Sequence, residues 1–136
     1  NRKGELMLQQ RALHKYHSPG LWTNTCCSHQ REGEGNIEAG TRRLKEEMGF
    51  KTALEELFSF TYKTSFDNGL TEHEFDHVMF GYYDGFPKIN LEEVASWKWM
   101  SLTKIKIDME KFPENYTAWF KIIFKRFYNH TKSIKH

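Results

Sequence analysis

The chain has 136 residues, of which 38% are hydrophobic and 28% are charged, and its formal net charge is +2. A chain of this length can bury a core of its own, so we expect a single domain over residues 1–136. The balanced charge gives no reason to expect a nucleic-acid partner. Because no run of 18 apolar residues occurs, we expect no membrane span.

Strand-like and helix-like segments are interspersed along the chain. Turn residues and periodicity predict strands over residues 5–11, 21–27, 57–65, 74–83 and 94–100. Helices are expected over residues 36–48, in a short irregular stretch that begins at Ser101, and beyond Pro113. Residues 67–69, Asp-Asn-Gly, read as the turn between two strands. This order predicts a mixed α/β (α+β) domain.

The first four residues, Asn-Arg-Lys-Gly, have the composition of a turn and stand directly before the first strand. A hairpin turn needs a strand on each side, and the chain has no initiator methionine. We therefore expect that an N-terminal segment of the domain precedes residue 1.

The helix expected over residues 36–48 carries two different faces. Asn36 can cap its start and Gly49 can end it. Helical spacing predicts an apolar stripe of Ile37, Thr41, Leu44 and Met48. The same spacing brings three charged residues together on another face: Arg43, Glu46 and Glu47.

The residues from 28 to 50 match most of the Nudix box, G-x5-E-x7-R-E-U-x-E-E-x-G-U. The matching positions are Glu34, Arg42, Leu44, Glu46, Glu47, Gly49 and Phe50. Adjacent glutamates on one helical turn supply hard oxygen ligands for Mg²⁺, and this ion can carry a diphosphate. The alternative is an ordinary charged helix exposed to solvent.

Two departures from the box change the expected chemistry. Ser28 replaces its first glycine, and Arg43 replaces the first glutamate of R-E-U-x-E-E. A guanidinium in place of a carboxylate removes part of the metal cluster that would activate water. It also adds a bidentate donor for phosphate oxygens. We interpret this site as one that holds a diphosphate rather than hydrolysing it.

The two cysteines of the chain are neighbours. On an extended backbone Cys27 and His29 point to one side and Cys26 to the other. Adjacent cysteines do not form an ordinary structural disulfide, so we expect a reduced protein in the cytoplasm. Cys26 is interpreted as a small core residue. Cys27 is either the same or a proton donor beside a metal ligand.

Three carboxylates alternate along the strand after the expected turn. On one face of a strand, Glu72, Glu74 and Asp76 would repel one another unless a cation or a proton were shared. With His29 they form a candidate metal site of mixed nitrogen and oxygen ligands. A solvent-facing edge strand is the alternative. Near the end of the chain, Trp119 lies in an aromatic-rich helix and is by itself most simply read as a core residue.

Taken together, these segments resemble type I isopentenyl diphosphate isomerase, a branch of the Nudix fold. The resemblance covers nearly the whole chain and rests on Arg11, Lys15, P-G-L-W-T-N-T-C-C-S-H at 19–29, Arg42-Arg43, Glu46-Glu47, Gly49, Tyr62, Glu72-His73-Glu74 and Trp119. It implies a Nudix-like mixed β-sheet sandwiched by helices. It also implies the isomerisation of isopentenyl diphosphate to dimethylallyl diphosphate through a tertiary carbocation.

The resemblance implies a role for each matched residue. Cys27 and Glu74 would transfer protons on opposite faces of the substrate, with Tyr62 beside Glu74. The diphosphate would be held by Mg²⁺ on Glu47 and by three cationic side chains: Arg11, Lys15 and Arg43. Trp119 would lie against the hydrocarbon tail. Which of the two catalytic residues handles which proton stays open.

A second divalent metal, Mn²⁺, Mg²⁺ or Zn²⁺, would be bound by His29, Glu72 and Glu74. The family completes this site with two histidines that would lie upstream of residue 1, so we expect weak or absent metal at the three remaining ligands. Two alternatives to an isomerase are a Nudix pyrophosphohydrolase of nucleoside diphosphate derivatives and a diphosphate-binding scaffold. We expect a monomer or a weak homodimer acting on a small-molecule diphosphate.

Overall fold

The computed structural model describes residues 1–14, 18–26, 33–65 and 71–134, with only the backbone described at 62–65, 71–76 and 130–134. Its elements, in chain order, are β1 Glu5–Arg11, β2 Trp22–Thr23, α1 Asn36–Met48, β3 Leu54–Ser65, β4 Thr71–Gly81, β5 Val94–Ser101, α2 Leu102–Lys111, the 3-10 turn η1 Pro113–Asn115 and α3 Ala118–Ile134. Within this part of the chain, no helix is both long and apolar enough to cross a bilayer.

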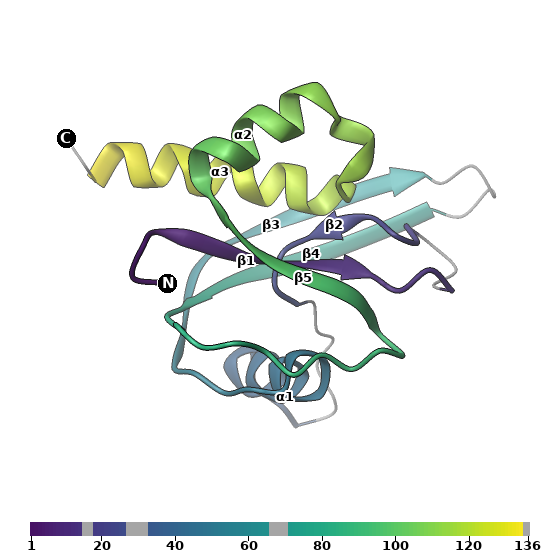
Figure 1. Ribbon diagram of the computed structural model, residues 1–136, viewed down its shortest axis with the longest axis vertical. Helices are drawn as coiled ribbons and strands as arrows, with labels where there is room; N and C mark the ends of the chain where they lie inside the picture. The colour runs from purple at the N-terminus through teal and green to yellow at the C-terminus, as the bar shows by residue number, and fades with distance from the viewer. Residues whose placement is uncertain (15–17, 27–32, 66–70, 135–136) are drawn as a thin grey trace.

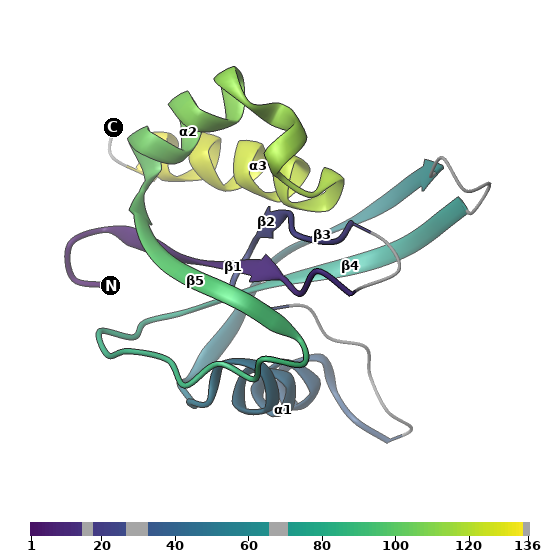
Figure 2. The same cartoon turned by 45° about the vertical axis from the view of Figure 1, so that its right-hand side comes forward.

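The strands lie between helices, with α1 on one side and α2 and α3 on the other (Figure 1). They form a three-stranded sheet in the order β2-β1-β5 and a hairpin of β3 and β4. Figure 2 shows that this hairpin extends beyond the three-stranded sheet. Pairing within both sheets is antiparallel, and a parallel bridge joins Trp22 to Tyr116. The predicted α+β fold with helices on both sides is confirmed.

The central strand β1 contributes to two separate cores. Leu8 is fully buried in an aromatic core on the α3 side, together with Trp119 and Phe120. Its neighbour Met7 packs instead with Leu44 and others of the α1 side. Successive side chains of a strand point to opposite faces, so one strand can serve both cores.

Glycine fixes the end of α1. The predicted bounds of this helix are correct, but its N-cap is Gly35 and not Asn36. At the other end Gly49 adopts a left-handed conformation with φ 75°, which favours glycine. A Cβ added there would lie 2.5 Å from the carbonyl oxygen of Lys88. Gly49 therefore both ends the helix and admits the segment that passes beside it.

The buried face of α1 differs from the predicted stripe. Ile37 is 47% exposed, and the buried residues are Ala39, Gly40, Leu44, Glu47 and Met48. A Cβ on Gly40 would lie 2.6 Å from the terminal carbon of Met79. Small residues let the helix approach the β3–β4 hairpin closely, and this approach, which the apolar spacing does not encode, rotates the buried face.

The strand expected over residues 21–27 is much shorter in the structure. β2 pairs with β1 only through Gln9 with Thr23 and Gln10 with Trp22. Beyond it, the Thr25 hydroxyl donates to the Met7 carbonyl at 2.6 Å, and the Asn24 amide turns back to the Cys26 carbonyl at 2.7 Å. Side-chain hydrogen bonds have replaced the backbone ladder here.

The boundaries of later elements also differ from the prediction. β3 begins at Leu54 rather than at residue 57, and β4 runs from Thr71 to Gly81 rather than from 74 to 83. Residues 67–69 of the expected turn lie outside the described chain. The stretch expected to be irregular after Ser101 is a regular ten-residue helix, because the Ser101 hydroxyl accepts from the Lys104 amide at 3.2 Å and caps it.

Two side-chain hydrogen bonds attach the segment before α3, one to strand β2 and one to helix α2. The hydroxyl groups of Thr23 and Thr117 are hydrogen-bonded at 2.8 Å. Tyr116, which precedes the helix, donates its hydroxyl to Asp108 of α2. Burial, with this bond to Asp108, raises the pKa of the Tyr116 phenol well above its usual range. These contacts fix the position of Trp119, two residues further on.

Candidate active site

The charged face of α1 is centred on a buried carboxylate. Glu47 is only 5% exposed, and its Oε1 accepts a hydrogen bond of 2.9 Å from Nε2 of Gln9. Its Oε2 accepts from the guanidinium of Arg43, one turn earlier. Burial raises the pKa of Glu47, while Gln9 and Arg43 oppose the shift. A carboxylate is thus held inside the protein by one neutral and one cationic donor.

Arg43 connects three acidic residues. Besides Glu47, its guanidinium lies 3.2 Å from Oε1 of Glu46 and 3.8 Å from Oε2 of Glu93. Burial would raise the pKa of Glu46, but its bonds and charge contacts with Arg43 and Arg42 outweigh this and lower the pKa. The prediction that Arg43, Glu46 and Glu47 share one face is confirmed.

Arg42, the other arginine that matches the box, binds two glutamates. Nε and Nη2 of Arg42 lie 2.8 and 3.1 Å from the two carboxylate oxygens of Glu34, and Nη1 lies 2.8 Å from Glu46. A bidentate pair of this kind fixes both partners in orientation as well as in distance. Glu34 and Arg42 therefore hold the chain that enters α1 against the helix.

Two residues of this cluster, Gln9 and Glu93, were not predicted from the sequence. Glu93 lies near Arg43 because the segment before β5 is hydrogen-bonded to the end of α1. The amide of Asn90 donates to the Glu47 carbonyl at 2.9 Å, and the amide of Lys88 donates to the Met48 carbonyl at 2.8 Å. No local sequence pattern predicts that this segment lies beside the helix. For Gln9 there is a weak signal, since strand alternation places it on the side of Met7.

The donor set fits a hard cation such as Mg²⁺. Each carboxylate oxygen has two lone pairs, so the bonds from Gln9 and Arg43 leave acceptor capacity on Glu47. Glu46 offers further oxygens on the same face. No group of three or more His, Cys, Asp or Glu residues gathers around a metal position within the described chain. His29 and the side chains of Glu72 and Glu74 lie outside this part of the chain.

The structure brings together two residues predicted to bind substrate. The guanidinium carbon of Arg11, at the end of β1, lies 5.3 Å from the ring centroid of Trp119. Strict alternation would send Arg11 toward α1 with Gln9, but the β1–β5 register shifts between Gln10 and Arg11. Such irregularities increase the local twist of a strand. Trp119 is 7% exposed and belongs to the aromatic core, so it packs as well as facing a cation.

The remaining predicted positions are only partly described. Lys15, Cys27 and His29 lie outside the described residues. For Tyr62, Glu72 and Glu74 the backbone alone is described: Tyr62 pairs with Glu74 in the hairpin, and Thr64 with Glu72. The register thus places Tyr62 and Glu74, the two residues expected to act together, at opposite positions of one ladder.

Cys26, predicted to be a buried core residue, lies at the edge of the core. It is half-buried and packs against the core that contains Met7, Leu44 and Met48. The carbonyl of Thr25, one residue earlier, accepts from Nε2 of Gln9 at 2.9 Å. The segment that leads to Cys27 is therefore tied to the residue that also contacts Glu47.

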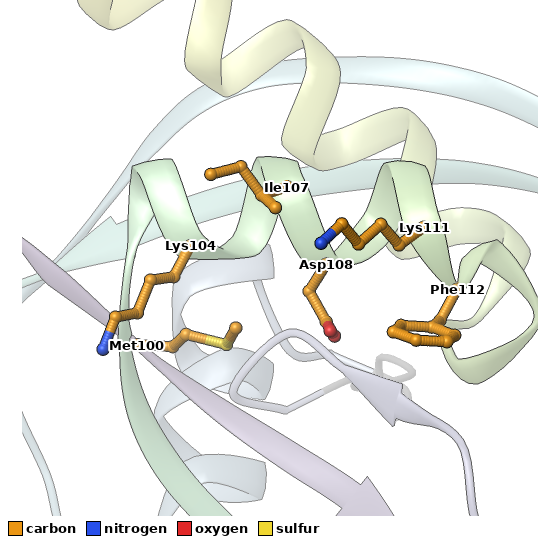
Figure 3. Close-up of a pocket in the computed structure, with 6 residues that line it drawn as sticks. All are labelled: Met100, Lys104, Ile107, Asp108, Lys111 and Phe112. Carbon is orange, nitrogen blue, oxygen red and sulfur yellow. The ribbon is translucent and has the colours of Figure 1, made fainter.

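A separate hollow lies beside α2 (Figure 3). Its volume is about 270 Å³, and it is lined by Met100, Lys104, Ile107, Asp108, Lys111 and Phe112. None of the predicted site residues lines it. Pockets for drug-sized ligands usually measure about 300–1,000 Å³, so this hollow is at most a marginal small-molecule site.

Comparison with known proteins identifies the family. A model described as the NUDIX domain matches residues 1–120. Isopentenyl-diphosphate Delta-isomerase of Pectobacterium atrosepticum is 48% identical over 135 residues, which are 99% of this chain and 75% of that protein. The chain is a NUDIX-domain member of the isopentenyl-diphosphate Delta-isomerase family. The resemblance inferred from the motifs is confirmed.

Other members of the family match as well. Isopentenyl-diphosphate Delta-isomerase 2 of Aromatoleum aromaticum is 55% identical over 114 residues, or 84% of this chain; the chain spans 60% of the length of that relative. Among solved structures, the MutT protein of Methanosarcina mazei Go1 superposes with a TM-score of 0.77 over 97% of this chain and 88% of that one, at 23% identity. A likeness at this identity shows the fold alone.

Proposed function

We propose that the protein isomerises isopentenyl diphosphate to dimethylallyl diphosphate. The observation that carries the proposal, beside the family, is the guanidinium of Arg43 at the buried Glu47. An arginine there withdraws one carboxylate from the charged face of α1 and provides a donor suited to phosphate oxygens. The same substitution disfavours the alternative, a pyrophosphohydrolase of nucleoside diphosphate derivatives, because that reaction needs a metal-activated water.

The headgroup end of the site would be formed by α1 and β1. Bound to Glu47, Mg²⁺ would supply positive charge that neutralises and orients the diphosphate. Arg43, Arg11 and Lys15 would donate hydrogen bonds to its oxygens. Arg43 is already poised among acidic partners, so exchanging a carboxylate for a phosphate oxygen leaves its guanidinium paired throughout.

The reaction moves one proton on and another off the carbon chain. An acid adds a proton to the terminal carbon of the double bond, and the charge appears on the neighbouring tertiary carbon. A base on the other face then removes a proton from the carbon on the headgroup side. We assign these two roles to Cys27 and Glu74, with Tyr62 as the hydrogen-bond partner of Glu74. Exclusion of water is required, since water would capture the cation.

The hydrocarbon end would be closed by Trp119. An indole face attracts a cation without forming a bond to it, at a gain of roughly 0.5–2 kcal/mol. The ring of Trp119 already faces the cationic Arg11 at 5.3 Å. We infer that the carbocation and the headgroup are stabilised by adjacent parts of one site.

A second divalent metal is proposed at His29, Glu72 and Glu74. One imidazole with carboxylates suits Mn²⁺, Mg²⁺ or Zn²⁺. We further propose that residues 1–136 belong to one domain, that the protein acts in the cytoplasm, and that it is a monomer or a weak homodimer. The adjacent cysteines support the reducing compartment.

The test uses the protein expressed from its complete coding sequence. With labelled isopentenyl diphosphate and Mg²⁺ it should yield an acid-labile allylic product. Cys27→Ala should lower the rate at least about 10²-fold, the low end for a positioned acid or base, whereas Cys26→Ala should leave it nearly unchanged. Absence of product from metal-loaded protein would refute the proposal. Release of phosphate or nucleoside monophosphate from a nucleotide panel would support the hydrolase instead.

A further inference from the structure

Gln9 is buried in the middle of β1 and joins two parts of the site. The residue is only 3% exposed. The single nitrogen Nε2 donates to Oε1 of Glu47 at 2.9 Å and to the carbonyl oxygen of Thr25 at 2.9 Å. One amide group therefore links the carboxylate of α1 to the segment that precedes Cys27.

The chemistry of the two partners fixes the orientation of the amide. A carboxylate and a peptide carbonyl can only accept hydrogen bonds here, so the NH₂ group must face both of them. Its two hydrogens match the two acceptors. A carboxylate at position 9 would instead place oxygens against both, and an apolar side chain would leave both without this donor.

Gln9 also differs from the second donor on Glu47. Arg43 is charged, is shared with Glu46 and Glu93, and is proposed above to turn to the diphosphate. Gln9 has no such competing partner among its described contacts: besides the two oxygens it reaches only the sulfur of Met48, at 3.8 Å. When Arg43 exchanges partners, Gln9 remains to hold Glu47.

We propose that Gln9 is a positioning residue of the isomerase: it orients Glu47 toward the metal-bound diphosphate and ties the backbone at Thr25 to that carboxylate. This inference rests on the proposed function. Residues that orient a metal ligand from outside typically contribute about 10–100-fold to metal affinity or activity.

The experiment compares Gln9→Met and Gln9→Glu with a matched control, Gln10→Met. Gln10 is the adjacent glutamine on the same strand, and its Nε2 donates to the Gly20 carbonyl at 3.1 Å, away from Glu47. We expect Gln9→Met to raise the Mg²⁺ concentration for half-maximal activity about tenfold. Activity should return in part at high Mg²⁺. Gln9→Glu should be worse, and Gln10→Met should match the wild type.

A second readout does not depend on turnover. Isothermal titration calorimetry with magnesium pyrophosphate should show weaker binding for both Gln9 variants and unchanged binding for Gln10→Met. Should the Gln9 variants bind like the control and differ only in melting temperature, the role is structural and the inference is overturned. If a Gln9 variant does not fold, the wild-type protein provides the test. The side-chain amide NMR signals of its Gln9 should shift when magnesium pyrophosphate is added, and unmoved signals would overturn the inference.

The two proposals fail in different ways. A wild-type protein without isomerase activity refutes the proposed function, yet the pyrophosphate titration still reports whether Gln9 orients Glu47. An active wild type whose Gln9 and Gln10 variants have the same Mg²⁺ requirement refutes the positioning role alone.

Discussion

The two faces of β1 border a buried polar cluster and an aromatic core. Toward α1, Gln9 and Glu47 bury polar groups, and each is matched by a donor or an acceptor. Toward α3, Leu8 and Trp119 bury apolar and aromatic surface, with Arg11 as the described cation facing the ring of Trp119. One strand borders both environments because its side chains alternate between the two faces.

The largest effect is expected on the apolar face. Trp119→Ala should lower the free energy of unfolding by about 3–5 kcal/mol, because it empties part of a closely packed aromatic core. It should also lower the kcat/KM of the protein that remains folded, since the ring that faces Arg11 is lost. Denaturant unfolding and steady-state kinetics measure the two effects separately.

The matched control for Trp119 is Phe120→Ala. Phe120 is buried in the same core at 2% exposure, and no cation has been found over its ring in the described contacts. We expect a similar loss of stability and a much smaller loss of kcat/KM. Equal losses of kcat/KM in the two variants would show that Trp119 acts only in packing.

The polar face should show the reverse pattern. Glu47→Gln keeps the shape of the side chain but removes the anionic ligand, so activity should fall by about 10²-fold or more. Stability should change less than activity: the cost of burying a charge disappears, but the new NH₂ group would face one of the two donors, Gln9 or Arg43. Glu38→Gln, in the exposed first turn of the same helix, serves as the control. A variant at Glu47 that loses activity only in proportion to a loss of stability would contradict a functional role.

The smallest effect is in the pH dependence of stability. The pKa of Glu47 is raised by burial above its ordinary 4.5, so the native state binds more protons than the unfolded state above that pH. The free energy of unfolding should therefore fall as pH rises from 4.5 through the raised pKa. Glu47→Gln should remove this decline in equilibrium denaturation measured at several pH values.

Glu46 provides the opposite sign. Its pKa is lowered by Arg43 and Arg42 against the effect of burial, so its contribution to stability is present above 4.5 and is lost as pH falls below that value. Glu46→Gln should flatten the acid limb; above pH 4.5 it should lower the free energy of unfolding by a constant amount and leave its slope with pH unchanged. A variant of Glu46 that changes the same pH range as Glu47→Gln would show that the two carboxylates titrate as one unit.

Local pattern was sufficient where the determinants lie within one element. The bounds of α1 and the cluster of Arg43, Glu46 and Glu47 follow from 3.6 residues per turn, and the stop follows from Gly49. The predicted buried stripe is confirmed at Leu44 and Met48 and wrong at Ile37, because Gly40 allows an approach to Met79 that only the assembled hairpin creates. The short β2 was missed for a similar reason: side-chain bonds to β1 end its ladder early.

By itself, the sequence determined the charged helix and the family, since spacing along one helix and a run of specific residue types are properties of the chain. The tertiary structure alone decided which distant residues meet that helix. Gln9 reaches Glu47 across 38 positions, Glu93 reaches Arg43 through a segment hydrogen-bonded to the end of α1, and Arg11 lies over Trp119 where the strand register shifts. These contacts depend on how strands and helices pack, and packing is a property of the folded chain as a whole.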